Sequence, residues 1–324
     1  MAYNWIAILG KYEFREEEIV FVGGERDYGE SRGSAIGNAV CDQMFSGGEI
    51  TAKIEFQGLI EQDTGCEIII YFEPATKYFV SAGIGGEPLA QFSARYFDSR
   101  GWNIIAASGE RINIQCGMEY EVRVVLTGSV LSLWVSGVEV IRATVPFTLP
   151  AGQVGIWNRG RSKCTIRDYR VATEEPTAFV AMQFSPPYND LFADVINPIC
   201  EEFRIKAIRS DETFSPGLII ADIVTQINTA KVVLADITPE NPNVFWELGY
   251  AHASRKPTIL ISEKGRKLPF DVSGFRILFY ENTIAGKRLV EDGLRKHLKA
   301  ILTELRIPTT GAAGTVVPPP RQAR

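Results

Sequence analysis

The sequence predicts two domains, an antiparallel β-sandwich followed by an α/β domain with a doubly wound parallel sheet of five strands. Three observations lead to this prediction. The chain has 324 residues, 45% of them hydrophobic, which is enough for two cores of ordinary size. Up to about residue 172 the polarity alternates every second residue, as in strands with one buried face. Beyond residue 177 short apolar runs alternate with stretches of helical spacing, as in a sheet covered by helices.

The first domain is expected to span residues 1–172. The segment 49–56 (EITAKIEF) places every second apolar residue on one face, and 120–126 (YEVRVVL) repeats that pattern. Two further strands are expected on either side of a turn at Ser136-Gly137, and 163–171 (KCTIRDYRV) ends the series. Because no helical period intervenes, these strands predict an antiparallel sandwich or jelly roll. The segment 154–171 (VGIWNRGRSKCTIRDYRV) resembles the last strands of concanavalin-like or laminin-G-like sandwiches.

That resemblance implies carbohydrate binding or cleavage as one function to test. Glu25, Asp27 and Glu30 follow the E-x-D-x-x-E spacing of sandwich-type glucanases, in which two carboxylates flank a sugar bond. The glycines around the triplet favour a solvated turn instead. The tryptophans that offer stacking surfaces for sugar rings are Trp102, Trp134 and Trp157. Aromatic residues of a sandwich also form its core, so a packing role competes with this one. The run GIGGEP at 83–88 is expected to be a hairpin turn, since no helical pattern follows it.

A polar, proline-containing segment, 173–177 (TEEPT), is expected to link the two domains. The α/β domain then covers 178–305, and the low-complexity tail 306–324 is expected to be flexible. Buried parallel strands are predicted from apolar runs at 178–184, 205–209, 231–236, 257–262 and 275–280. Helices are predicted at 188–203, 217–230, 242–254 and 288–305, with Pro198 expected to bend the first of them.

Several segments of this domain together resemble the nucleoside 2-deoxyribosyltransferase-like superfamily, which is related in fold to Toll/interleukin-receptor (TIR) domains. The matching segments, in order, are FVAMQFSPPYNDLF, RSDETF, GLIIADIVTQI, VVLADITPENPNVFWELGYAHASRKPTILI and LPFDVSGFRILFY, over residues 178–281. The resemblance implies a flavodoxin-like fold and places the family's nucleophilic glutamate at Glu247. TIR-type enzymes use a helix glutamate to break the nicotinamide–ribose bond of NAD, which implies the same chemistry here.

The residues around Glu247 point to that chemistry without the family. A strand ends at Asp236, and a helix capped by Asn241 or Asn243 begins just after it. Glu247 therefore lies near the helix start, where backbone amides and the helix dipole favour an anion. Cleavage of an N-glycosidic bond builds positive charge at C1′, which a carboxylate stabilises or traps.

Further candidates for contacts to a nucleotide are expected around the same mouth of the sheet. Phe184 and Trp246 are candidates to stack on a base, Tyr250 is expected to share a helix side with Glu247, and the polar candidates are Asp222, Asp236, Asn241 and Asn243. Helix capping competes with a functional role for each acidic residue. Deoxyribosyltransferases carry a second aspartate where this chain has Asn241, so hydrolysis or plain nucleotide binding is favoured over base exchange.

Composition excludes several other classes of function. The formal charge of −5 and a pI near 5.4 argue against a duplex nucleic acid as partner. Two histidines and five scattered cysteines without a CxxC pair signal neither a metal site nor a disulfide framework. No apolar stretch is long enough to cross a bilayer, so a cytoplasmic protein is expected.

The leading hypothesis is a nucleotide N-glycosidase, with NAD as substrate, no cofactor and a sandwich that regulates it. By analogy of architecture, such a protein would be a bacterial defence effector, and a homo-oligomer is left open. One alternative is a sensor that binds a nucleotide without cleaving it. In another alternative, the sandwich carries the function by binding a glycan or a protein ligand.

Overall fold

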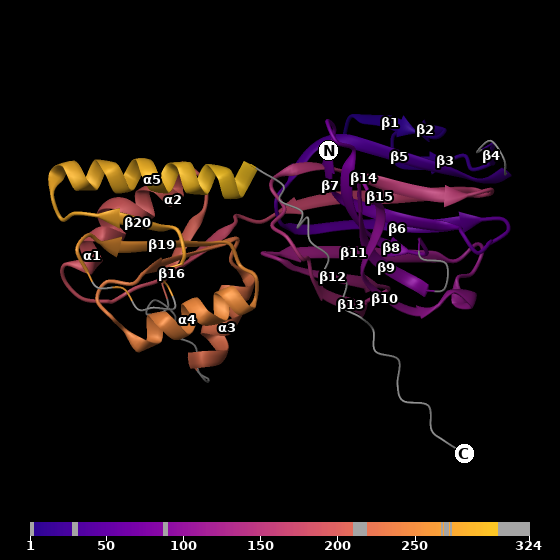
Figure 1. Cartoon of the computed structure of the whole chain (residues 1–324). Coiled ribbons are helices and arrows are strands. Elements are labelled where there is room, and N and C mark those ends of the chain that lie inside the picture. The colour runs from indigo at the N-terminus through magenta and orange to yellow at the C-terminus, as the bar shows by residue number, and fades with distance from the viewer. Residues whose placement is uncertain are drawn as a thin grey trace, which may run out of the picture.

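The chain forms two bodies that lie side by side, a β-sandwich and an α/β domain (Figure 1). The structure, a computed structural model, describes residues 3–27, 32–86, 90–209, 219–266, 268, 272 and 274–303. Glu30 and the predicted tail at 306–324 lie outside the described residues. The division into an antiparallel and a parallel half agrees with the prediction.

The sandwich consists of two antiparallel sheets, here called sheet A and sheet B. Sheet A has the order β1-β5-β14-β7-β8-β9-β10, with β4 paired to β5, and sheet B has the order β13-β12-β11-β6-β15-β3-β2. The strands of sheet A are β1 (Trp5–Leu9), β4 (Glu25–Asp27), β5 (Arg32–Phe45), β7 (Gly65–Glu73), β8 (Tyr78–Ile84), β9 (Ala90–Asp98), β10 (Gly101–Glu110) and β14 (Gly152–Gly160). The strands of sheet B are β2 (Tyr12–Phe14), β3 (Glu18–Phe21), β6 (Gly48–Gln57), β11 (Glu119–Thr127), β12 (Val130–Val135), β13 (Val138–Thr144) and β15 (Lys163–Thr173); a 3₁₀ turn, η1 (Arg111–Asn113), precedes β11.

The inner faces of the two sheets form one core, and the alternating sequence pattern explains which residues enter it. In β6 the apolar residues are buried and Lys53 and Glu55 between them face outward. The neighbouring strand continues the same face, because Ile54 pairs with Tyr120 and Ala52 with Val122. Burial of each large apolar side chain contributes roughly 1.5–3 kcal/mol to folding. The period-two prediction is therefore confirmed for these strands.

The turn between β12 and β13 is a tight hairpin, as predicted. Ser136 and Gly137 both have positive φ, 49° and 81°. Two successive positive φ values define the turn type that matches the right-handed twist of paired strands, and glycine reaches this region without steric cost.

The α/β domain is built on a five-stranded parallel sheet with the order β17-β16-β18-β19-β20. This order is that of the flavodoxin-like doubly wound fold. The strands are β16 (Thr177–Ala181), β17 (Lys206–Arg209), β18 (Val232–Asp236), β19 (Thr258–Glu263) and β20 (Ile277–Tyr280). All five residues of β18 are buried, as expected of a central strand covered on both faces.

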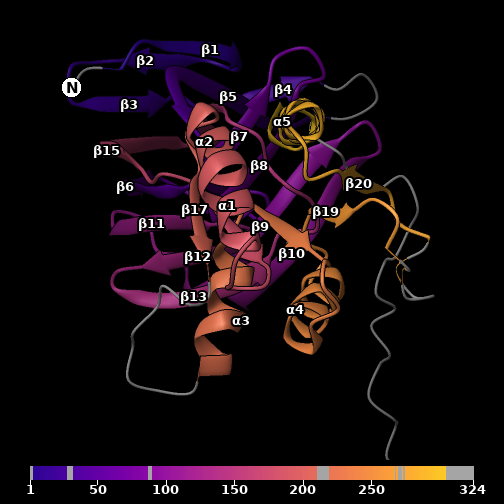
Figure 2. The same cartoon turned by 90° about the vertical axis from the view of Figure 1, so that its left-hand side faces the viewer.

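Helices cover both faces of this sheet (Figures 1 and 2). The helices are α1 (Tyr188–Leu191), α2 (Asn197–Glu202), α3 (Ile219–Thr229), α4 (Pro242–Ala253) and α5 (Ile284–Thr303). One core cluster joins the sheet to α2 and α5, and a second joins its other face to α3 and α4. The carboxyl ends of the strands point away from the sandwich, and the amino ends face it (Figure 1).

The first predicted helix is interrupted rather than merely bent. A π-helical turn, η2 (Phe192–Ile196), separates α1 from α2. Pro198, two residues after this turn, has no N–H to donate to it. The wider π-helical turn accommodates the hydrogen bond that proline cannot make, which is a common way for a helix to tolerate an irregularity.

The junction between the domains is shorter than the predicted linker. Thr173 ends β15 and Thr177 begins β16, so only residues 174–176 lie between strands. The Glu174 amide donates to Gly47 O at 3.0 Å, and Pro176 O accepts from the Lys206 amide at 2.9 Å. The two ends of the junction are thus each tied to one domain.

Two buried lysines of the α/β domain also bond to the sandwich. Lys231 Nζ donates to Leu149 O at 3.1 Å, and Lys256 Nζ donates to Ser129 Oγ at 2.8 Å. Lys256 Nζ also donates to Ala230 O at 3.0 Å, within its own domain. Burial lowers the pKa of Lys231 to about 8, and burial together with the charge of Lys231 lowers the pKa of Lys256 to about 7. A buried donor without an acceptor is costly, so these bonds favour the docked arrangement.

We expect a glutamate-specific protease to spare the bond after Glu174, because a short junction fixed at both ends cannot extend into a protease cleft. Lys256→Ala should raise the cleavage rate there about tenfold, since each unsatisfied buried group costs roughly 1–3 kcal/mol. Mass spectrometry of the fragments over time gives the measurement. Rapid cleavage of the parent protein at this junction would contradict the docked arrangement.

Candidate functional site

The first candidate site lies where the parallel strands end. Asp236 is the last residue of β18 and only 1% of it is exposed. Its Oδ1 accepts from the Thr238 amide at 3.1 Å, and its Oδ2 accepts from the Tyr280 hydroxyl at 3.5 Å. Asp236 thus holds the loop that leads to α4 and connects it to the end of β20.

Glu247 lies in the second turn of α4, on the side that packs against the sheet. Val244, Leu248 and Ala251 are buried around it, and only 4% of Glu247 is exposed. A side chain on a helix leans toward the helix N-terminus, and that end of α4 lies at the carboxyl edge of the sheet. The carboxylate is therefore directed toward the region where ligands of doubly wound folds bind.

Glu247 has neither a hydrogen bond nor an ion pair within the described part of the chain. Burial raises the pKa of Glu247 to about 7, and burial is also the main cause that raises the pKa of Asp236 to about 7. An unpaired buried carboxyl is unfavourable for folding, so it is retained mainly where it has a function. Buried carboxyls with raised pKa values therefore concentrate at functional sites.

The structure decides between the two candidate caps of α4. Asn241 is the N-cap, because its Oδ1 accepts from the Asn243 amide at 3.0 Å. Asn241 Nδ2 donates to Gln183 Oε1 at 2.6 Å, which ties the cap to the end of β16. Asn243 is exposed and contributes its backbone amide. The Asn241 side chain is therefore occupied in positioning the helix that carries Glu247.

The other predicted contacts fall in two places. Phe184 follows β16 at the same edge and is 38% exposed, with the guanidinium carbon of Arg209 5.1 Å from its ring centroid. Asp222 lies in the first turn of α3. Both positions suit a ligand at the carboxyl edge.

Trp246 and Tyr250 lie elsewhere. Their rings stack 5.8 Å apart, and the Tyr250 hydroxyl accepts from Asn228 Nδ2 at 2.8 Å, toward α3. Tyr250 also lines a cavity between the two domains, beside Arg123 of the sandwich. The Tyr250 hydroxyl is therefore turned toward α3, although three residues of helix place Tyr250 only about 60° from Glu247 around the helix axis.

Tyr280 and Gln183 are the two residues of this edge that sequence reasoning missed. Tyr280 lines a cavity of about 300 Å³ together with Tyr188, Asp190, Glu263 and Lys287. Its place as the last residue of the predicted strand FRILFY was the available signal. Gln183 offered no signal, because only the folded chain brings it beside Asn241.

A second candidate site lies on the outer face of sheet A, the face that does not contact sheet B. Glu67 is fully buried there and accepts from the hydroxyls of Ser81 and Ser93, each at 2.6 Å. Arg95, 4% exposed, donates from Nε to both Glu67 oxygens, at 2.9 and 3.0 Å, and from Nη1 to Gly86 O at 2.7 Å. Its Nη2 is buried without a partner among the described residues.

Two of the predicted tryptophans enclose this arginine. The Arg95 guanidinium carbon lies 3.5 Å from the ring centroid of Trp102 and 4.2 Å from that of Trp157. Trp157 is buried, whereas Trp102 is 39% exposed and forms the outer surface. Trp134 lies on sheet B, under Arg123. The sequence pointed to the tryptophans and missed Glu67 and Arg95, because nothing in a strand pattern shows an ion pair on an outer face.

The predicted carboxylate triplet does not build a site in the described structure. Glu25 and Asp27 are both exposed on the short edge strand β4. They share one side of that strand, since they are two positions apart. Within the described ranges no group of three His, Cys, Asp or Glu side chains is placed to hold a metal ion. No helix that the structure describes is long and apolar enough to span a membrane.

Comparisons with known proteins concern the sandwich half. No family model and no curated protein matches the sequence. A carbohydrate-binding module, CBM66, from Bacillus subtilis is 13% identical, with a TM-score of 0.39 over 52% of this chain and 93% of its own. A Bacillus subtilis protein of unknown function with a galectin-like fold is 12% identical, with a TM-score of 0.38 over 51% of this chain and 87% of its own. A prokaryotic β-1,3-1,4-glucanase from a mouse hindgut metagenome is 12% identical, with a TM-score of 0.37 over 51% of this chain and 90% of its own.

Fold and sites define the chain as a two-domain protein, an antiparallel β-sandwich joined to a doubly wound α/β domain with a buried carboxyl at its carboxyl edge. None of the three similar structures is described as a deoxyribosyltransferase or a TIR-like protein. That resemblance and the NAD-cleaving activity that it implies stay predictions.

Proposed function

We propose that the α/β domain cleaves the N-glycosidic bond of a nucleotide, with NAD as the leading substrate and Glu247 as the group that stabilises or traps the cation at C1′. One observation carries the proposal. Glu247 is a buried carboxyl that bonds to nothing in the described chain, at the edge where ligands of this fold bind. A buried, unpaired carboxyl lowers the stability of the fold, and a role in acting on a ligand explains why it is present.

NAD fits this site because its cleavage makes few demands on the protein. The C1′–N bond breaks, its electron pair leaves with nicotinamide, and the pyridinium nitrogen becomes neutral without receiving a proton. The cation at C1′ is then met by the Glu247 carboxylate, and water adds there with release of one proton. No second acidic residue is required for the leaving group, which agrees with Asn241 being used as a helix cap.

The direct test is to incubate purified protein with NAD and to follow nicotinamide release in the parent and in Glu247→Gln. A protein that binds NAD but never releases nicotinamide would instead be a nucleotide sensor. The expected result for the variant is argued in the Discussion.

A second candidate function is carbohydrate binding by the outer face of sheet A, and a specific observation favours it. Trp102 is exposed beside a buried polar layer, and Arg95 keeps one unpartnered donor beneath it. A flat aromatic ring next to hydrogen-bond donors is a surface that suits a sugar ring. This function is compatible with the first, since the two sites lie in different domains.

We expect Trp102→Ala to weaken binding of any soluble oligosaccharide that the parent binds by at least ~10-fold, equivalent to about 1.4 kcal/mol. Tryptophan fluorescence in titrations with a panel of oligosaccharides gives the measurement. Trp134→Ala is the matched control, because that ring lies on the other sheet. Equal affinity in Trp102→Ala and the parent would rule out this surface.

A further inference from the structure

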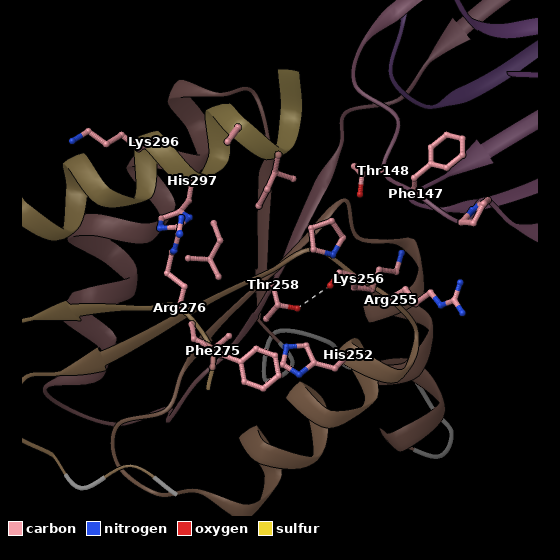
Figure 3. Close-up of a pocket in the computed structure, with 16 residues that line it drawn as sticks. Phe147, Thr148, His252, Arg255, Lys256, Thr258, Phe275, Arg276, Lys296 and His297 are labelled. Atoms are coloured by element: carbon pink, nitrogen blue, oxygen red, sulfur yellow. Dashed lines mark hydrogen bonds between the residues drawn. The ribbon is translucent and has the colours of Figure 1, made fainter. Parts of the chain in front are cut away.

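A large cavity between the two domains has no part in either proposed function. It measures about 940 Å³ and lies at the amino ends of β19 and β20, opposite to the edge that holds Asp236 and Glu247. Figure 3 shows the residues of both domains that line it. Its walls come from the segments 146–148 of the sandwich and from 252, 255–260, 275–276, 296–297 and 300–301 of the α/β domain. A volume of this size suits a small molecule rather than a macromolecule.

The rim of this cavity is basic. Arg255, Arg276 and Lys296 are exposed, His252 and His297 are half-buried, and no carboxylate is among the lining residues. None of the three cations forms an ion pair with a described residue, although ten other arginines in the described part of the chain do. Such a cluster stands out in a chain whose formal charge is −5. Like charges without a counterion repel each other, and an anion from solution relieves that repulsion.

The two histidines of the cavity have lowered pKa values, and a cation of the rim contributes to one of them. The Arg276 and His297 side chains point toward each other in the cavity (Figure 3), and burial together with the charge of Arg276 lowers the pKa of His297. Burial also lowers the pKa of His252. Near neutral pH the two imidazoles are therefore mostly uncharged hydrogen-bonding groups, and the fixed positive charge comes from the arginines and Lys296.

The floor of the cavity is apolar and one wall is aromatic. Pro257, Ile259 and Ile301 contribute to the floor. The rings of His252 and Phe275 stack 4.5 Å apart and close to parallel, and Phe275 is 46% exposed (Figure 3). Phe147 of the sandwich lines the other end. This arrangement offers flat apolar contacts next to an anion-binding rim.

Lys256 belongs to the wall and not to the ligand-binding groups. Its Nζ is engaged by Ser129 Oγ of the sandwich, and by Ala230 O and Asn228 O of the α/β domain. A cavity whose wall is bonded to both domains changes shape when the domains shift. A ligand that fills it therefore favours one arrangement of the domains over others.

We propose that this interdomain cavity binds a phosphorylated ligand with an aromatic ring, of the nucleoside polyphosphate class. The phosphates lie against Arg276 and the neighbouring basic rim, and the ring lies against Phe275 and the apolar floor. The site is separate from Glu247, so it holds whether or not the carboxyl edge is catalytic. Because its walls come from both domains, the ligand stabilises their docked arrangement.

The test uses the full chain and isothermal titration with ATP, inorganic triphosphate and adenosine. We expect saturable binding of ATP, competition by triphosphate, and binding of adenosine weaker by at least ~100-fold, because the charged rim contributes most of the attraction. Arg276→Glu should weaken ATP binding by at least ~10-fold. Because Arg276 lies at the amino ends of the strands, away from Glu247, this loss separates the cavity from the carboxyl edge.

Lys299→Glu is the matched control, since it makes the same charge change on an exposed position of α5 that does not line the cavity. Arg255→Glu provides a second rim variant should Arg276→Glu fail to fold by circular dichroism. Three results would each overturn the proposal: no saturable binding of ATP, an equal loss in Lys299→Glu, or full affinity in both rim variants.

Discussion

Glu247→Gln should reduce nicotinamide release from NAD by at least ~100-fold, which corresponds to about 2.7 kcal/mol of transition-state stabilisation. The amide keeps the size of the side chain and its capacity for hydrogen bonds, and removes only the negative charge. Nucleotide affinity should stay close to that of the parent, because the charge is required for the step and not for recognition. The comparison uses the condition that activates the parent.

The same variant should be more stable than the parent at neutral pH. In the unfolded chain Glu247 ionises near its ordinary pKa of 4.5, whereas burial raises the pKa of the folded protein's Glu247 to about 7. Ionisation therefore opposes folding increasingly as the pH rises from 4.5 to 7, and the penalty is constant above that. Glu247→Gln removes it, a gain of up to about 3 kcal/mol above pH 7 that vanishes below pH 4.5.

These readouts separate the possible roles of Glu247. Thermal melts at pH 4.5 and 7.5 test the buried carboxyl, and initial rates across the same range test the chemistry. In the parent the rate should rise with pH through about 7, as the carboxylate forms. Unchanged turnover in a folded Glu247→Gln would refute the mechanism. Inactivity of parent and variant alike under every trigger would favour the nucleotide sensor.

Arg95→Met should destabilise the β-sandwich by about 3–5 kcal/mol, because it leaves Glu67 as an unpaired charge in a buried position. Glu67 is fully buried, and Arg95 supplies two of its hydrogen bonds. Ser81 and Ser93 would still donate hydrogen bonds to Glu67, but their neutral hydroxyls would not balance its charge. Urea unfolding followed by tryptophan fluorescence gives the measurement, because Trp102 and Trp157 lie against Arg95.

Two further variants show whether the loss comes from the unpaired charge. The double variant Glu67→Leu, Arg95→Met should recover at least half of the lost stability, because it removes both charges together. Arg142→Ala removes an exposed ion pair with Glu139 in the same domain and should leave the unfolding midpoint unchanged. A loss below about 1 kcal/mol in Arg95→Met would mean that water or the serines satisfy Glu67.

Sequence alone determined the class of each domain and the buried faces of the clearest strands. The alternation in 49–56 and 120–126 identified the buried residues, since a one-residue slip would turn the apolar set outward. The apolar run of β18 and the helical spacing of α4 located the strand end at Asp236 and the helix that carries Glu247. These patterns follow from the geometry of a single strand or helix, so they can be recognised without knowing how the elements pack together.

Only the tertiary structure decided which side chains meet. Glu67 and Arg95 come from strands 28 positions apart in sequence, and Asn241 meets Gln183 over 58 positions. The basic cavity joins segments of both domains, and its exposed cations come from positions 255, 276 and 296, which are far apart in sequence. Tyr250 turned out to face α3 rather than Glu247, because the neighbouring helix supplied the partner for its hydroxyl. Such contacts depend on how whole elements pack against one another, and the period of a single segment carries no information about the element that lies across from it.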